Sequence, residues 1–161
     1  MSAATQAGRI HWEDLEVGSS VTLGPISPSR EDIIAFAQQF DPQPFHLDDE
    51  AAKASVFGGL CASGWHTCSL AMRLMSTQFL PNTTSLGSPG MDQVKWPKPV
   101  FPGDQLTLRH TILEKRASQK RPDVGLVRTQ WEMFNQHNDA VLHMQSWSMF
   151  RRRHRADENA G

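Results

Sequence analysis

The stretch GWHTCSLAMRLMSTQF, residues 64–79, predicts the element around which the chain folds. Its large apolar side chains fall on more than one side of a helix: Leu70, Met72, Leu74 and Met75. A helix that is apolar around much of its girth is a buried one, and the small residues between these positions let it lie close to a sheet. Leu80-Pro81-Asn82 is expected to end it, because proline cannot continue a helix. The sequence therefore predicts a long, buried central helix.

The segment before this helix is predicted to be helical as well. Ser29 is a good N-cap, and Asp32 stands three residues later, where it can reach back in a near capping box. Apolar residues then recur at helical spacing, which predicts a helix over residues 30–40. The stretch DPQP, residues 41–44, ends that helix, because a residue before proline is pushed out of the helical region. A second short helix, capped by Asp48 or Asp49, is expected before Ser55.

The second half of the chain is predicted to be strand. Alternating and β-branched segments indicate strands at residues 91–96, 106–112, 126–134 and 140–150, and a short one at 21–23. In the last of these, His143 and Trp147 share a face, and core packing is predicted for that face. One buried helix followed by strands joined by hairpins predicts an α+β fold, with a curved antiparallel sheet wrapped around the helix. Such a sheet leaves edges to be paired, which favours a homodimer.

Length and charge narrow the class of protein. The chain has 161 residues, which fits one domain. Its formal net charge is -1, so it lacks the excess of basic residues expected of a protein that coats nucleic acid or an anionic membrane. We expect a single domain over residues 11–152, a flexible segment 1–10 and a disordered tail 153–161. No apolar run is long enough to cross a membrane, and the N-terminus does not resemble a signal peptide, which predicts a cytoplasmic protein.

The side chains present limit the chemistry. Tyrosine is absent, so acid–base work has to come from other residue types. Cys61 and Cys68 are seven residues apart with no further ligand at a suitable spacing, which predicts reduced, buried thiols and no metal site.

Asp41 and His46 form the most suggestive pair. Four residues separate them, two of which are proline, so the loop holds both side chains with little freedom to lose. A carboxylate beside a histidine can set the histidine's tautomer, and such a pair can hold a water and move its protons. The alternative from spacing alone is that Asp41 is a turn residue and His46 a structural histidine.

Ser63 and Gly64 stand at the predicted start of the central helix. Free backbone N–H groups at a helix N-terminus stabilise an oxygen that gains negative charge. A glycine there would also let a substrate carbonyl approach the backbone closely. A turn that merely precedes a helix is the alternative interpretation.

Together these residues resemble the MaoC-like dehydratase family, which includes the (R)-specific enoyl-CoA hydratases and has the hot-dog fold. The family's D-x-N-P-x-H-x-D motif matches residues 41–48, with Gln43, a longer amide, in place of the asparagine. The run that ends in the glycine before the central helix matches residues 57–64. A second signature, V-x-W-x-x-P-V-x-P-G-D, matches residues 94–104. The resemblance covers residues 12–152.

The resemblance implies a hydratase or dehydratase that acts on the double bond of a 2-enoyl-CoA in fatty acid metabolism. Asp41 and His46 match the pair that activates water, without an assignment of base and acid, and Gly64 matches the glycine that binds the thioester carbonyl, with Ser63 beside it. An acyl pocket is expected from Phe45, Trp65 and Met72, and CoA phosphate contacts from Lys95 and Lys98. No cofactor beyond the coenzyme A of the substrate is expected, and the assembly implied is a homodimer or a dimer of dimers.

Two other functions remain open from the sequence. A hot-dog thioesterase would direct water at the carbonyl carbon rather than at the β-carbon. A non-catalytic module would bind acyl thioesters without turnover.

Overall fold

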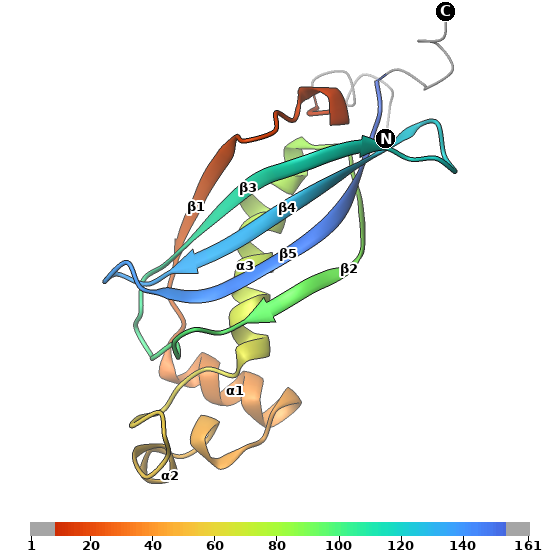
Figure 1. The fold of residues 1–161 in the computed structure, drawn as a ribbon. Coiled ribbons are helices and arrows are strands. Elements are labelled where there is room, and N and C mark those ends of the chain that lie inside the picture. Colours follow the sequence, from red (N-terminus) through yellow and green to blue (C-terminus); the bar gives the residue numbers. More distant parts are fainter. Residues whose placement is uncertain (1–8, 154–161) are drawn as a thin grey trace, which may run out of the picture.

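The computed structural model describes residues 9–153, and its centre is the helix α3, Gly64–Gln78. Ser63 caps it by accepting a hydrogen bond from the Trp65 amide. Its inward side chains are almost fully buried: Thr67, Ala71, Leu74 and Met75. Figure 1 shows α3 lying along one face of the sheet. The helix is buried on that side only, since Trp65 and Met72 are 60% and 44% exposed, so its apolar girth predicted more burial than is observed.

Five antiparallel strands form the sheet: β1 (Ser20–Ile26), β2 (Ser85–Lys95), β3 (Leu106–Ala117), β4 (Val124–Phe134) and β5 (Ala140–Arg151). Their order across the sheet is β1-β3-β4-β5-β2, so β1 and β2 are the two edges. The α+β arrangement expected from the sequence, a sheet curved around one long helix, is therefore the one observed (Figure 1).

Two smaller helices gather at the end of the molecule where α3 begins (Figure 1). Helix α1 spans Arg30–Phe40, and the predicted capping box between Ser29 and Asp32 is present. Helix α2, Asp49–Lys53, is capped by Asp48. The loop between α1 and α2, residues 41–48, is called the proline loop below. It lies beside the N-terminus of α3, where Asp41 contacts Ser63.

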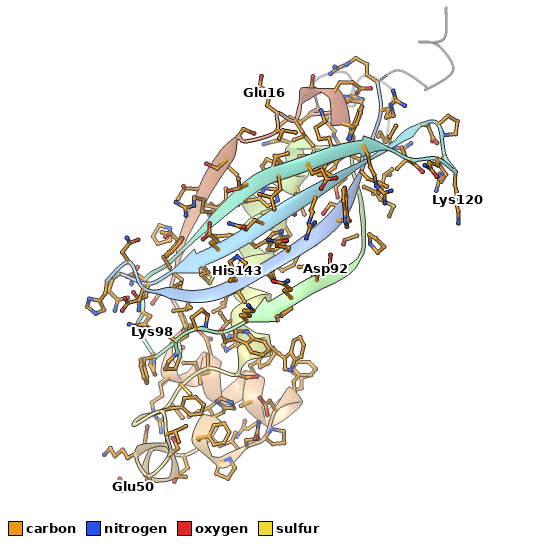
Figure 2. All side chains as sticks on the ribbon, viewed as in Figure 1. Glu16, Glu50, Asp92, Lys98, Lys120 and His143 are labelled. Carbon is orange, nitrogen blue, oxygen red and sulfur yellow. The ribbon has the colours of Figure 1, made fainter. Side chains whose placement is uncertain are left out.

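The prediction that the His143 and Trp147 face of β5 packs in the core was wrong. Leu142, Met144 and Ser146 lie opposite Met133, Trp131 and Thr129 of β4, whose side chains are buried. His143 instead pairs across the strands with Glu132 and lies on the face of the sheet that looks away from α3 (Figure 2). Both faces of β5 carry large apolar side chains, so its own alternation could not decide which one meets the helix.

Strand β2 is longer than predicted. It begins at Ser85 rather than Met91, because its first residues pair with β5 through several bulges. Pro89 lies within it, which a strand tolerates at the edge of a sheet, where an N–H can be missing. Residues that look like a loop by composition thus extend the free edge of the sheet.

The ends of the domain are tied to its body. Ile10 forms a parallel bridge with Thr83, and the Arg153 guanidinium pairs with Asp14 at 2.8 Å. The remainder of the predicted flexible segment and tail, residues 1–8 and 154–161, lies outside the described residues. Within the described part of the chain, every helix is too short or too polar to cross a membrane.

His110 of β3 should make stability depend on pH. It is only 3% exposed, between the rings of Phe79 and Trp131, and burial lowers its pKa from 6.5 to about 4. Between pH 6.5 and about 4, His110 takes up a proton in the unfolded chain but stays neutral in the folded one. The free energy of unfolding should therefore fall by roughly 1–3 kcal/mol as the pH drops from about 6.5 to about 4.

Urea unfolding at a series of pH values checks this. His110→Leu should flatten the fall, whereas His137→Gln, at an exposed hairpin position, should leave it unchanged. Equal slopes for wild type and His110→Leu would contradict the assignment.

Candidate functional site

A hollow of about 490 Å³ lies where the proline loop, the start of α3 and the segment after β2 meet. Most of its wall is apolar, and the polar groups Asp41, Gln43, His46 and Lys98 reach into it. Its apolar wall is built from Phe45, Phe57, Trp65, Trp96, Pro97, Pro99 and Val100. An apolar cavity with a few convergent polar groups is the usual form of a small-molecule site.

The structure brings Asp41 and His46 together. Asp41 is the C-cap of α1, and His46 ends the 3-10 helix Pro44–His46. The Nε2 atom of His46 lies 3.4 Å from Oδ2 of Asp41, and their side chains are 6% and 17% exposed. The prolines restrict the loop backbone and so hold these two side chains side by side in the wall of the hollow.

A backbone carbonyl decides the tautomer of His46. Its Nδ1 lies 2.6 Å from the Cys61 carbonyl oxygen, which can only accept, so Nδ1 carries the hydrogen. In the neutral ring, Nε2 is then an acceptor with its lone pair directed at the Asp41 side of the hollow. This arrangement suits a group that takes a proton from a bound water.

The Asp41 carboxylate is held ionised. It receives hydrogen bonds from the Ser63 hydroxyl at Oδ2 and from the Gln43 amide at Oδ1, each at 2.7 Å. Burial opposes ionisation, but these two bonds and the nearby His46 outweigh it, so the pKa of Asp41 lies below its ordinary value. Asp41 is therefore an acceptor, available to orient a water.

The start of α3 lies beside this pair. The Gly64 amide is at the first position of the helix, where an N–H has no acceptor within the helix itself. A Cβ at Gly64 would lie 2.5 Å from the indole ring of Trp96. The glycine is thus required by the packing of Trp96, a role that the sequence interpretation of close substrate approach did not include.

The residues predicted for the acyl pocket and for the CoA phosphates do not all lie in this hollow. Phe45 and Trp65 line the hollow, but Met72 lies in a second, apolar hollow between α3 and β2, together with Trp65 and Met91. Lys98 stands at the rim and pairs with Asp139 of the β4–β5 hairpin at 3.0 Å (Figure 2). Lys95 ends β2 opposite His143, outside the lining of the hollow.

Phe57, Trp96 and Gln43 are lining residues that the sequence did not place in the hollow. Trp96 stands in the second signature and Gln43 in the first, so the motifs themselves carried a signal for both.

The two cysteines are free, and Cys61 is buried as predicted, whereas Cys68 is only half-buried. Cys61 lines the hollow, but burial raises the pKa of its thiol to about 11, so it stays protonated and is a poor nucleophile. Among residues 9–153, no group of three or more His, Cys, Asp or Glu side chains is arranged to hold a metal ion.

Comparison with known proteins gives one consistent result. The model of the MaoC like domain family matches residues 14–131. A crystal structure of a MaoC-like dehydratase from Rhodospirillum rubrum is 41% identical, covers 90% of this chain and 99% of its own, and superposes with a TM-score of 0.84. The R-hydratase PhaJ1 from Pseudomonas aeruginosa is 26% identical over 88% of this chain and 86% of its own, with a TM-score of 0.72.

The uncharacterized protein YdeM of Bacillus subtilis is 28% identical over 124 residues, which cover 77% of this chain and 86% of that protein. These similarities confirm the hot-dog fold predicted from the motifs.

The Gly64–Trp96 contact can be tested by substitution. Gly64→Ala should displace the indole ring and lower the free energy of unfolding by about 1–3 kcal/mol, the usual cost of overpacking. Adding Trp96→Leu should recover part of that loss, because the new methyl group then has room. Urea unfolding, with circular dichroism as the readout of the folded fraction, measures both effects.

Gly59→Ala is the matched control, since its Cβ would meet Phe101 at an ordinary 3.7 Å. A Gly64→Ala protein as stable as wild type would show that Trp96 does not require the glycine.

Proposed function

The chain belongs to the MaoC-like domain family, and from this premise we propose that it adds water reversibly to the double bond of a 2-enoyl-CoA. The observation that carries the proposal is the Asp41–His46 pair, which faces a hollow beside the N-terminus of a buried helix. The proposed setting is fatty acid metabolism in the cytoplasm.

In the proposed mechanism, one water in the hollow donates its hydrogens to Nε2 of His46 and Oδ2 of Asp41, which lie 3.4 Å apart. His46 accepts a proton from this water through Nε2, while the water oxygen attacks the β-carbon of the enoyl group. The electron pair of the double bond moves onto the thioester carbonyl to form an enolate. The Asp41–His46 pair then returns the proton to the α-carbon, so the net result is the addition of H and OH.

The start of α3 supports the enolate in this mechanism. The Gly64 N–H and the positive end of the helix dipole are suited to an oxygen that gains negative charge. Ser63 donates its hydroxyl hydrogen to Asp41 and thereby connects the carboxylate to the same helix end. The charge that develops on the substrate therefore meets groups that are already oriented.

The remaining contacts define the proposed substrate class. Phe45 and Trp65 provide an apolar wall for the acyl group. Lys98 is 56% exposed at the rim, where its ammonium group could meet a CoA phosphate in exchange for Asp139, and Lys95 is a weaker candidate because it lies outside the lining.

Turnover of an enoyl-CoA tests the proposed activity. Wild type should hydrate a short substrate such as crotonyl-CoA, measured by loss of the conjugated enoyl absorbance. Asp41→Asn and His46→Gln should each lower kcat by about 10²–10⁴-fold with the fold intact by circular dichroism. Asp49→Asn and His137→Gln, both at the surface and away from the hollow, are the matched controls.

Two outcomes would contradict this function. Release of free thiol from acyl-CoA, measured with a thiol reagent, would indicate a thioesterase. Tight binding without turnover across a panel of enoyl-CoAs would indicate a binding module.

The proposed assembly is a homodimer formed through β2, alone or within a dimer of dimers. β2 is an edge strand with most of its residues exposed, and an unpaired edge is a template for a second strand. The adjacent surface is apolar, since Trp65, Met72 and Met91 are 60%, 44% and 43% exposed. A second copy would cover both features together.

Sedimentation velocity measures this assembly. Wild type should sediment as a dimer or larger, and Met91→Asp should shift it towards the monomer because a charge would be buried in the interface. Val56→Asp, at a 96% exposed position away from β2, should leave the assembly unchanged. A monomeric wild type would contradict the interface.

A further inference from the structure

Gln43 occupies a restricted position in the proline loop. Its backbone is extended, with φ −87° and ψ 144°, as expected for a residue that precedes proline. The backbone N–H of Gln43 donates to the backbone carbonyl oxygen of Asp41 at 2.7 Å, which forms a tight turn between the two residues. The side chain of Gln43 therefore starts from a fixed point beside Asp41.

The contact between the two side chains has one possible direction. The terminal amide of Gln43 lies 2.7 Å from Oδ1 of Asp41, and an ionised carboxylate can only accept. The NH₂ group must therefore face Asp41, as a donor to a charged acceptor, which is among the stronger hydrogen bonds in proteins.

The two oxygens of Asp41 consequently have different partners. Oδ2 receives the Ser63 hydroxyl and faces Nε2 of His46, whereas Oδ1 is held by Gln43 on the opposite side. A carboxylate held at one oxygen alone can rotate about its Cβ–Cγ bond. Held at both, it keeps Oδ2 directed at the histidine.

We infer that Gln43 is a positioning residue for the proposed hydration: its amide fixes the orientation of the Asp41 carboxylate and stabilises its ionised form. The inference rests on the proposed function for its kinetic consequences, but the contact itself does not. The lowered pKa of Asp41, to which the Gln43 hydrogen bond contributes, supports it.

The length of the side chain matters in this loop. Asparagine, the residue common at this position of the motif, is one methylene shorter. We therefore expect asparagine, placed on the same backbone, to lose the 2.7 Å contact that the Gln43 amide makes with Oδ1. In this chain the family-like residue should therefore fail to replace glutamine.

Kinetics of three variants test the inference. Gln43→Ala and Gln43→Asn should each lower kcat for crotonyl-CoA by about tenfold to a hundredfold, the cost of a misdirected catalytic group, with KM nearly unchanged. A fall in kcat at nearly constant KM separates this loss of orientation from a loss of substrate binding. Gln39→Ala, an exposed glutamine on α1, should match wild type in both measurements.

Carbon NMR of protein labelled at the aspartate carboxyl groups provides a readout that does not need turnover. The Asp41 signal, assigned by its loss in Asp41→Asn, should titrate at higher pH in Gln43→Ala than in wild type. A shifted titration in a protein without turnover would overturn the proposed function and keep the positioning role. An unshifted titration, or a Gln43→Ala enzyme with wild-type kcat, would overturn the role of Gln43.

Discussion

The Ser63 hydroxyl joins two parts of the molecule that come from different segments of the chain. It accepts the hydrogen bond that caps α3, from the Trp65 amide, and it donates to Oδ2 of Asp41 at 2.7 Å. A buried helix has to satisfy its first N–H groups, and here the group that does so also anchors the carboxylate of the loop. The orientation of the Asp41–His46 pair is thereby tied to the placement of α3 in the sheet.

A second contact fixes the other side of the hollow. Trp96, which follows β2, lies against Gly64 so closely that any larger residue there would require the indole ring to shift. The signature at residues 94–104 thus has a physical role: it places the aromatic ring of Trp96 against the end of the helix at Gly64. Asp104 completes the turn by accepting hydrogen bonds from the Phe101 amide and the Gln136 side chain.

Several parts of the site could be predicted because their causes are local. The capping box of Ser29 and Asp32 starts α1, and the prolines that flank Gln43 end it and stiffen the loop. The proximity of Asp41 and His46 follows from that short, stiff connection. Met72 was different: the family resemblance implied that it would line the acyl pocket, but in the structure it lines the second hollow, between α3 and β2.

The sequence by itself determined the long central helix, its start beside Ser63 and Gly64, and the α+β class, because apolar periodicity and prolines act within a few residues of one another. The tertiary structure alone decided which face of β5 meets α3, how far β2 extends, and that Gln43 and Ser63 hold opposite oxygens of Asp41. Those features depend on the register and spacing of segments that are distant in the chain. Side chains with the same local pattern can satisfy more than one such arrangement until the segments pack.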